Sequence, residues 1–271
     1  MELTVLSWNL FHGRDFPPDP ALLTWRSRLL RVSERNATHI QVNRDLTREF
    51  ATVLSDARWD VALLQECPPR FCEPLAAASG AEPHRVLTSR NAAGRLRALA
   101  ARLNPDLIAS GEGGSNLTLA RDDGAAGAIV ERREAVIHAG PSERRAMAFT
   151  RTASGVCFAN LHASAHLPDR AAEDVMRAAE LASGWAADAP LVFGGDLNLR
   201  PGRSPAAFEQ LERRFGLTGA TAPDAIDHLL CRGLEPVEGP TRWPAERREV
   251  PCEGLALRLS DHAPVEARFA A

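Results

Sequence analysis

The chain has 271 residues, of which 45% are hydrophobic and 25% charged, and its formal net charge at pH 7 is -3. This composition is that of an ordinary globular protein whose core is large enough to need no metal or disulfide support. The negative charge argues against a dedicated, tight, non-specific nucleic-acid binder, and five cysteines without a C-x-x-C pair indicate neither a zinc knuckle nor a disulfide framework.

The spacing of apolar residues predicts the secondary structure. Short apolar runs bounded by glycine, proline or polar residues predict strands, and apolar residues repeated at helical spacing predict helices. In chain order we expect a strand at Leu3–Leu10, a helix at Thr47–Ala57, a strand at Val61–Gln65, a helix at Arg90–Leu103, strands at Leu117–Ala120, Ala126–Val130, Ala135–Ile137, Ala146–Thr150 and Val156–His162, a helix at Pro168–Trp185, a strand at Leu191–Gly194, a helix at Ser204–Phe215, and strands at Ala225–Leu230 and Ala263–Phe269.

The connections between these elements are short. Residues 15–20, rich in proline and aspartate, predict a loop, and residues 121–127 predict a turn between two strands. No linker, repeat or low-complexity tract divides the chain. We therefore expect one domain over residues 1–271, with an α/β fold in which the strands form two packed sheets and the helices lie outside.

The chain carries no sign of a membrane or a secretory route. Its first residues lack a basic stretch and a long apolar run, and no apolar segment is long enough to span a bilayer. The few cysteines fit a reducing compartment. We expect a cytoplasmic protein with no membrane segment and no obligate protein partner.

Six short segments place a hard-oxygen or imidazole group at the end of an apolar run. Each one alone has an ordinary explanation as a turn or a structural histidine. The segment Gly194-Gly195-Asp196-Leu197-Asn198 is a more specific signal, because its glycines let the backbone turn abruptly and bring two oxygen-bearing side chains together. The others are Ser7-Trp8-Asn9-Leu10, Leu64-Gln65-Glu66, Ala159-Asn160-Leu161-His162, Ala225-Ile226-Asp227-His228 and Leu259-Ser260-Asp261-His262-Ala263-Pro264.

Together and in this order, the six segments resemble the endonuclease/exonuclease/phosphatase superfamily, which includes pancreatic-type deoxyribonucleases, exonuclease III-like repair nucleases, neutral sphingomyelinases and inositol-phosphate 5-phosphatases. The matches run from Asn9 to His262 and so cover nearly the whole chain. The resemblance implies a four-layer α/β/β/α sandwich with two mostly antiparallel sheets. Calcineurin-like metallophosphatases also carry Gly-Asp motifs, but this chain lacks the Gly-Asn-His and Gly-His-x-His ligands of their two-metal site.

The resemblance also implies a metal ion. Carboxylate and amide oxygens select Mg²⁺, Mn²⁺ or Ca²⁺ over Zn²⁺, and we expect Mg²⁺ or Mn²⁺ as the cofactor. By resemblance, Glu66 is the firmest ligand and Asn9 and Asp261 assist it. Such an ion polarises a phosphate oxygen and offsets charge on the leaving oxygen.

The remaining motif residues receive catalytic roles from the same resemblance. His262 is expected to act as general base or electrostatic partner for the attacking water, with Asp227 as the acid that orients it. Asp196 and Asn198 would position the water and the phosphate. His162 matches the second histidine of the deoxyribonuclease and sphingomyelinase branches; repair endonucleases use a tyrosine in this region, and this chain has none.

A few further residues are open to two interpretations. Asn116 either contacts substrate or is structural. His12 and Arg14 either face the cleft or belong to a solvated loop. We expect no catalytic role for His228, because it points away from Asp227 on a strand. The arginines and the tryptophan of Arg242-Trp243-Pro244, Arg247 and Arg248 either grip a phosphate or form a charged surface loop.

Substrate choice stays open at this point. We expect an enzyme that hydrolyses a phosphate ester, with DNA or RNA slightly ahead as the substrate. The alternative is a phosphatase or phosphodiesterase that acts on a phospholipid, an inositol phosphate or a small molecule, which needs only one or two arginines besides the metal. A catalytically silent binding protein on the same scaffold and an unrelated metalloenzyme are the remaining alternatives.

Overall fold

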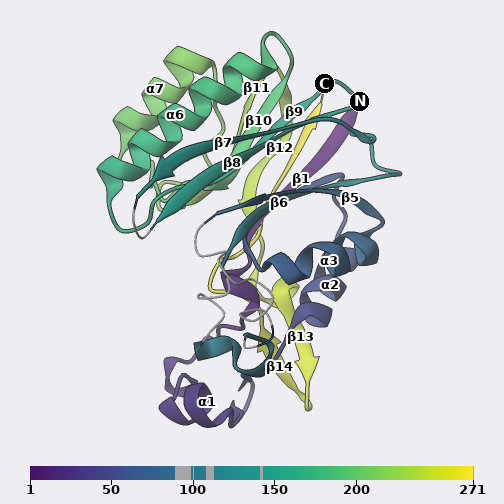
Figure 1. Ribbon diagram of the computed structural model, residues 1–271, viewed down its shortest axis with the longest axis vertical. Coiled ribbons are helices and arrows are strands. Elements are labelled where there is room, and N and C mark those ends of the chain that lie inside the picture. The colour runs from purple at the N-terminus through teal and green to yellow at the C-terminus, as the bar shows by residue number, and fades with distance from the viewer. Residues whose placement is uncertain (89–98, 100, 108–112, 141–142, 271) are drawn as a thin grey trace.

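Two sheets packed face to face form the centre of the molecule (Figure 1). The structure is a computed structural model, and it describes residues 1–88, 99, 101–107, 113–140 and 143–270. The six-stranded sheet has the order β12-β15-β1-β4-β6-β5, and the five-stranded sheet has the order β11-β10-β9-β8-β7. Only the pairs β1/β4 and β9/β10 are parallel among the described strands of these sheets. The bounds are β1 Glu2–Asn9, β4 Val61–Cys67, β5 Ala81–Leu87, β6 Ser115–Arg121, β7 Ile129–Ala139, β8 Arg144–Thr152, β9 Cys157–His162, β10 Leu191–Asp196, β11 Asp227–Arg232, β12 Glu235–Arg242 and β15 Val265–Ala270.

Helices cover the outer face of each sheet. Helices α6 (Pro168–Ala186) and α7 (Pro205–Phe215) cover the five-stranded sheet, and α2 (Thr47–Asp56) and α3 (Cys72–Ser79) cover the six-stranded sheet (Figure 1). Each interface has its own buried apolar cluster, and a third cluster fills the space between the sheets. The predicted four-layer sandwich is thus confirmed. None of the described helices is long and apolar enough to cross a membrane.

Strand β1 shows why its apolar run is nearly continuous. Leu3 and Val5 point into the cluster between the two sheets, whereas Leu6 and Trp8 point outward into the cluster beneath the helices. There the Trp8 ring lies 5.1 Å from the ring of Phe50 on α2. A strand buried on both faces has no solvent side, so the period-two alternation of a half-exposed strand disappears.

A small lobe adjoins the end of the sandwich where β1 finishes (Figure 1). It holds helix α1, two short hairpins and the loops between them. Bridges between Asp15 and Leu259 and between His39 and Ala256 join its N-terminal and C-terminal parts. The lobe and the nearby connections contain α1 Trp25–Leu30, β2 Glu34–Arg35, β3 Ile40–Gln41, β13 Glu249–Cys252 and β14 Leu255–Arg258, with the 3-10 turns η1 Phe11–Gly13, η2 Pro20–Leu22, η3 Pro69–Phe71 and η4 Ala245–Arg248.

Several elements differ from the sequence prediction. The two strands expected at Ala126–Val130 and Ala135–Ile137 are one strand, β7, whose middle is polar because it lies at a sheet edge. Strand β12 is exposed almost throughout, so it gives no apolar signal. The helix predicted at Arg90–Leu103 lies mostly outside the described residues.

The glycines of the Gly-Gly-Asp motif have a different role from the one expected. Gly194 and Gly195 lie within β10 rather than at a turn. A Cβ atom on Gly195 would lie 2.0 Å from the Leu161 carbonyl oxygen, and the backbone φ of Gly195 is +126°. The missing side chain therefore lets β9 and β10 approach closely and fixes the position of Asp196, the next residue.

We expect Gly195→Ala to destabilise the protein by at least about 2 kcal/mol, because it adds both a backbone clash and a strained φ. Urea unfolding measures the loss. Gly184→Ala on α6 is the matched control, since nothing lies within 4 Å of its added Cβ and alanine favours a helix. Equal unfolding midpoints for wild type and Gly195→Ala would contradict the close approach of β9 and β10.

Candidate active site

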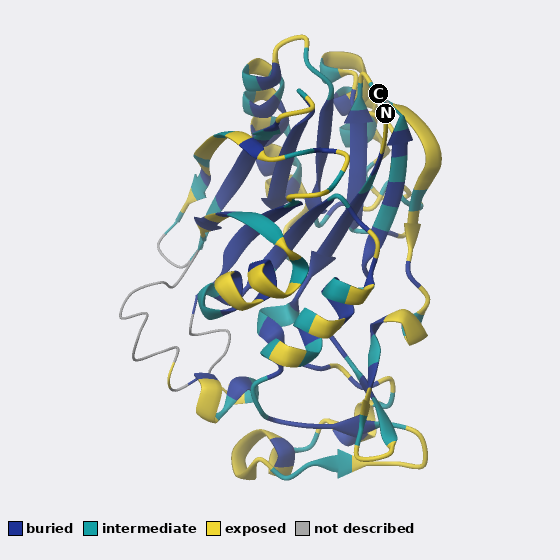
Figure 2. Cartoon of the chain, turned by 90° about the vertical axis from the view of Figure 1, so that its right-hand side faces the viewer, coloured by how far each residue is buried: buried dark blue, intermediate teal, exposed yellow. Residues whose placement is uncertain are grey.

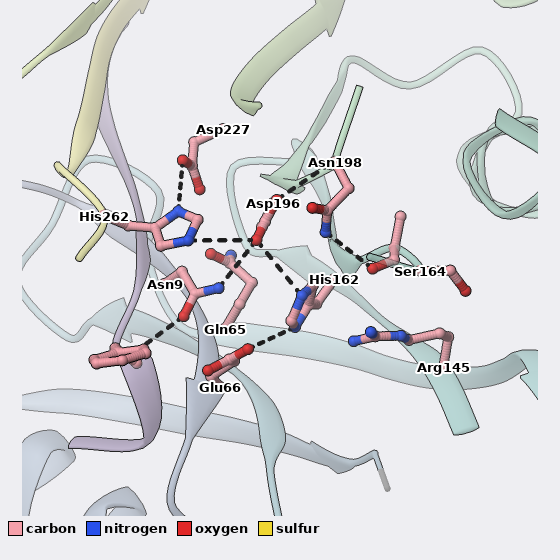
Figure 3. A network of polar contacts seen from close by, with 12 residues as sticks. Asn9, Gln65, Glu66, Arg145, His162, Ser164, Asp196, Asn198, Asp227 and His262 are labelled. Carbon is pink, nitrogen blue, oxygen red and sulfur yellow. Dashed lines mark hydrogen bonds and ion pairs between the residues drawn. The ribbon is translucent and has the colours of Figure 1, made fainter. Parts of the chain in front are cut away.

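Eight residues predicted from the six sequence segments meet at one rim of the two sheets, and all of them except Asp261 are labelled in Figure 3. Strand pairing explains this, because Asp196 at the end of β10 is in register with both His162 of β9 and Asp227 of β11. Seven of the eight line one cavity of about 480 Å³, and Asp227 lies behind His262. The cavity residues from the prediction are Asn9, Glu66, His162, Asp196, Asn198, Asp261 and His262.

Asp227 and His262 form a hydrogen-bonded pair. Nδ1 of His262 lies 2.8 Å from Oδ2 of Asp227, and Nε2 faces Oδ2 of Asp196 at 3.9 Å. Burial alone would lower the pKa of His262, but the carboxylates of Asp227, Asp196 and Asp261 outweigh burial and raise the pKa to about 10. Because Asp227 occupies Nδ1, Nε2 is the nitrogen that faces the cavity (Figure 3).

Asp196 is the buried centre of the cluster. Oδ2 of Asp196 accepts a hydrogen bond from Nδ2 of Asn9 at 3.0 Å, and Oδ1 accepts one from the backbone N–H of Asn198 at 3.1 Å. Burial, followed by the nearby Asp227 carboxylate, raises the pKa of Asp196 to about 7. Asn198 itself has a left-handed backbone (φ 52°), and its side chain donates to the carbonyl of Ala163.

His162 enters the cavity from the end of β9. Its Nε2 lies 3.5 Å from Oδ2 of Asp196, and its Nδ1 lies 3.9 Å from Oε1 of Glu66. Burial and the positive charge of Arg145 hold the pKa of His162 well below its ordinary value. His162 is therefore neutral at neutral pH, and its ring can donate one hydrogen bond without adding a charge.

Left-handed backbone at Phe11, His12 and Glu66 brings the side chains of His12 and Glu66 together. Glu66 has φ 46°, and Phe11 and His12 have φ 48° and 54°. Left-handed residues other than glycine are uncommon and cluster at functional sites. Here the strain brings Nε2 of His12 to 3.2 Å from Oε2 of Glu66. His12 thus contacts the site through Glu66, and the imidazole of His162 lies 3.9 Å from the other oxygen of the same carboxylate.

The oxygen atoms on this side of the cavity fit a hard divalent cation. Glu66 and Asp261 both line the cavity, and partial burial, together with the negative charge of Glu66, raises the pKa of Asp261 against the opposing effect of His262. A cation between these carboxylates would relieve that repulsion. Oδ1 of Asn9 already accepts a hydrogen bond from the backbone N–H of Phe11 at 3.0 Å. Asn9 would therefore bind the cation through the second lone pair of Oδ1.

Asp196, Asp227 and His262 also offer three ligand atoms within 4.8 Å of one another. A cation that took Nδ1 of His262 would replace the proton that joins this nitrogen to Asp227. That exchange would break a charge-assisted hydrogen bond. We therefore favour the Glu66 and Asp261 side of the cavity as the place that holds a cation.

The loop that carries Asp261 and His262 is held by residues to which the sequence motifs assign no role. Arg248 is buried, and its guanidinium donates to the carbonyls of Leu259, Ser260 and His262. Trp8 donates from Nε1 to the same His262 carbonyl at 3.0 Å. Arg248 therefore fixes the loop in place, and it is neither a phosphate ligand nor a solvated charge.

Two polar residues behind the site link the sheets. Nε2 of Gln65 in β4 donates to Oδ1 of Asn160 in β9 at 2.9 Å, and both side chains are fully buried. Asn116 is also fully buried and donates to the carbonyl of Ala146 at 2.7 Å, so the structure does not bring it to the cavity. His228 bonds the backbone of Leu199 and Thr221, in agreement with the structural role expected for it.

The remaining residues that were open to two interpretations also make structural contacts. Arg14 stacks on the ring of Phe11, 3.7 Å from its centroid. Arg242 pairs with Asp224. Trp243 is buried and donates to Glu266, and Arg247 covers its ring.

Comparisons with known proteins agree with the four-layer fold. A Bacteroides vulgatus endonuclease/exonuclease/phosphatase is 14% identical, with a TM-score of 0.63 over 99% of this chain and 98% of that chain. The mannosyl-6-phosphatase Bt3783 of Bacteroides thetaiotaomicron VPI-5482 is 15% identical, with a TM-score of 0.61 over 99% of this chain and 100% of that chain. Truncated TDP2 of Caenorhabditis elegans is 15% identical, with a TM-score of 0.59 over 100% of this chain and 98% of that chain.

At these identities the solved structures show a shared fold. Comparison with curated protein sequences gave no match. The model of the endonuclease/exonuclease/phosphatase family matches residues 6–262, a range that includes every cavity residue described above. The chain therefore belongs to the endonuclease/exonuclease/phosphatase family.

Proposed function

We propose that this protein hydrolyses a phosphodiester with water, that Mg²⁺ or Mn²⁺ assists the reaction, and that nucleic acid is the substrate. One observation carries the proposal. His262, paired with Asp227, lines a single cavity together with Asp196, Glu66 and Asp261. Its Nε2 is turned inward, 3.9 Å from Oδ2 of Asp196 and 3.8 Å from Oδ1 of Asp261. This arrangement sets a group that can exchange a proton beside carboxylates that can hold a cation.

The roles of the chain's own side chains follow from their contacts. Asp227 holds the Nδ1 proton of His262, so that Nε2 faces the attacking water and accepts its proton when the imidazole is neutral, a form that grows as the pH rises toward its pKa of about 10. Asp196 lies beside Nε2 and orients the same water. His162 is neutral and donates a hydrogen bond to a phosphate oxygen. A divalent cation held by Glu66 and Asp261, with help from Asn9, would polarise the phosphate and offset charge on the leaving oxygen.

A small phosphate ester is the second candidate substrate. The cavity volume of about 480 Å³ is in the range of small-ligand sites. Among the arginines of the described residues, Arg200 is the one that lines the cavity, and a single phosphate needs no more than one or two. One structurally similar protein is a mannosyl-6-phosphatase, which is consistent with this candidate.

A substrate panel with and without metal tests the proposal. We expect turnover of bis-p-nitrophenyl phosphate and cleavage of plasmid DNA with Mg²⁺ or Mn²⁺ at low salt, and loss of both with EDTA. Full turnover in EDTA would remove the metal from the mechanism. If DNA and RNA survive while a small diester or a phosphate monoester is hydrolysed, the substrate is small and the nucleic-acid part of the proposal is wrong.

A further inference from the structure

Helix α1 has its apolar side chains on the wrong side for a helix that packs on a core. Ser27 is its one buried residue. Trp25 and Leu29 lie two positions before and after Ser27, and successive helical residues are separated by ~100°, so both point away from the protein. Their exposed fractions are 65% and 55%, and Leu30 is exposed by 61%. Figure 2 shows the exposed helix at the lower end of the molecule.

Arginines flank this outward apolar face. Arg26 and Arg28 lie on either side of it, and Arg31 follows at the C-terminal cap; all three are exposed. No acidic residue lies within residues 25–31. The nearest in sequence, Glu34, is half-buried and accepts a hydrogen bond from Thr24. The face therefore combines exposed aromatic and aliphatic groups with positive charge from Arg26 and Arg28, although Arg28 is also attracted to the carboxylate of Asp106.

We propose that this face of α1, made of Trp25 and Leu29 with Arg26 and Arg28 on either side and the exposed Leu30 next to Arg26, docks on an anionic lipid bilayer. Tryptophan and leucine between basic residues are the composition of helices that lie in the membrane interface. The arginines pair with lipid phosphates while the apolar side chains enter the acyl boundary. The inference goes beyond the proposed function and does not rest on it.

Two other occupants fit the same face less well. A second copy related by a two-fold axis would place the same arginines opposite one another. A nucleic-acid strand would use Trp25 for stacking, but leucine side chains have no π-face to stack on bases. The bilayer uses both the charge and the aliphatic groups.

Helix α1 also lies near the catalytic cavity. Thr24, Ser27 and Arg28 line a second cavity, of about 270 Å³. Phe11 lines this cavity and the catalytic one. The second cavity is on the Ser27 side of α1, opposite the outward apolar face.

Co-sedimentation of the full chain with vesicles tests the inference. We expect binding to vesicles of phosphatidylglycerol and phosphatidylcholine, weaker binding at high salt, and little binding to phosphatidylcholine alone. Bound protein should show a blue shift of tryptophan fluorescence, because Trp25 is exposed whereas Trp8, Trp59 and Trp243 are buried and Trp185 is half-buried against Phe149. Trp25→Ala combined with Leu29→Ala should weaken binding roughly tenfold or more, and Arg26→Gln about fivefold.

Matched controls separate docking from folding and from catalysis. Val130→Ala combined with Val136→Ala removes two exposed apolar groups from β7 and should leave vesicle binding unchanged. The Trp25→Ala/Leu29→Ala variant should keep the wild-type unfolding midpoint and the wild-type rate on any soluble phosphodiester that the protein cleaves.

The inference is overturned if the wild-type protein does not bind anionic vesicles, if it binds neutral vesicles equally well, or if the Trp25→Ala/Leu29→Ala variant binds like wild type. Self-association or oligonucleotide binding through α1, without vesicle binding, overturns it as well.

Discussion

Glu66→Gln should abolish metal-dependent hydrolysis while leaving the fold intact. Glutamine has the shape of glutamate, and both residues tolerate the left-handed backbone at this position equally. The change removes the negative charge that we assign to the cation. Because a bound cation stabilises the transition state by several kcal/mol, the rate should fall on the order of 10³-fold. Turnover of bis-p-nitrophenyl phosphate at saturating Mn²⁺ measures this loss.

A thermal readout separates loss of the cation from loss of the fold. Glu66 raises the pKa of both Asp196 and Asp261 by repulsion, although burial is the larger cause for each. Without metal, the relief of this repulsion offsets the weakened contact with His12, so the Glu66→Gln variant should be close to wild type in stability. Added Mn²⁺ should raise the melting temperature of wild type, since it binds only the folded state, and should not raise that of the variant.

Glu173→Gln is the matched control. Its side chain is 73% exposed on α6, where it forms an ion pair with Arg170. We expect wild-type turnover and a wild-type response to Mn²⁺. Retained activity in Glu66→Gln, or an equal Mn²⁺ response in wild type and Glu66→Gln, would move the cation site elsewhere, with Asp196, Asp227 and His262 as the next candidates.

The strand ends of the site could be predicted because each motif is contiguous in sequence. A run such as Val156–His162 identifies both the strand and the polar group that ends it. The family resemblance then supplies which ends meet, and parallel pairing of β9 with β10 brings His162 beside Asp196. The remaining geometry depends on residues distant in sequence, and a single chain without its fold gives no measure of those distances.

Two residues show what the sequence does not reveal. His12 reaches Glu66 only because Phe11 and His12 adopt left-handed backbone, and nothing in Leu10-Phe11-His12-Gly13 besides the glycine signals that conformation. Arg248 belongs to a segment that reads as a charged surface loop, yet it is buried against three carbonyl groups. Its burial depends on the loop of residues 259–262, which lies 11 to 14 residues further along the chain.

Asp227→Asn should reduce kcat by roughly 10² to 10⁴ without unfolding the protein, because His262 would lose the acid that orients it and fixes its Nδ1 proton. His262→Ala and the double variant should lose about as much as the single change, since the two side chains act as one unit. Asp224→Asn, three residues earlier and 75% exposed, is the matched control and should keep wild-type activity.

The pH profile distinguishes this orienting role from a merely structural one. In wild type the carboxylates, Asp227 first among them, raise the pKa of His262 against the effect of burial, so the neutral imidazole that accepts a proton increases as the pH rises into the alkaline range. With Asp227 changed to asparagine, burial is opposed less strongly and the pKa of His262 falls. The rising limb of the rate should therefore move to lower pH while the maximum rate decreases. If the rate of the variant drops but the rising limb of its pH profile stays at the same pH, Asp227 does not set the protonation of His262. The proton acceptor would then be a group other than His262.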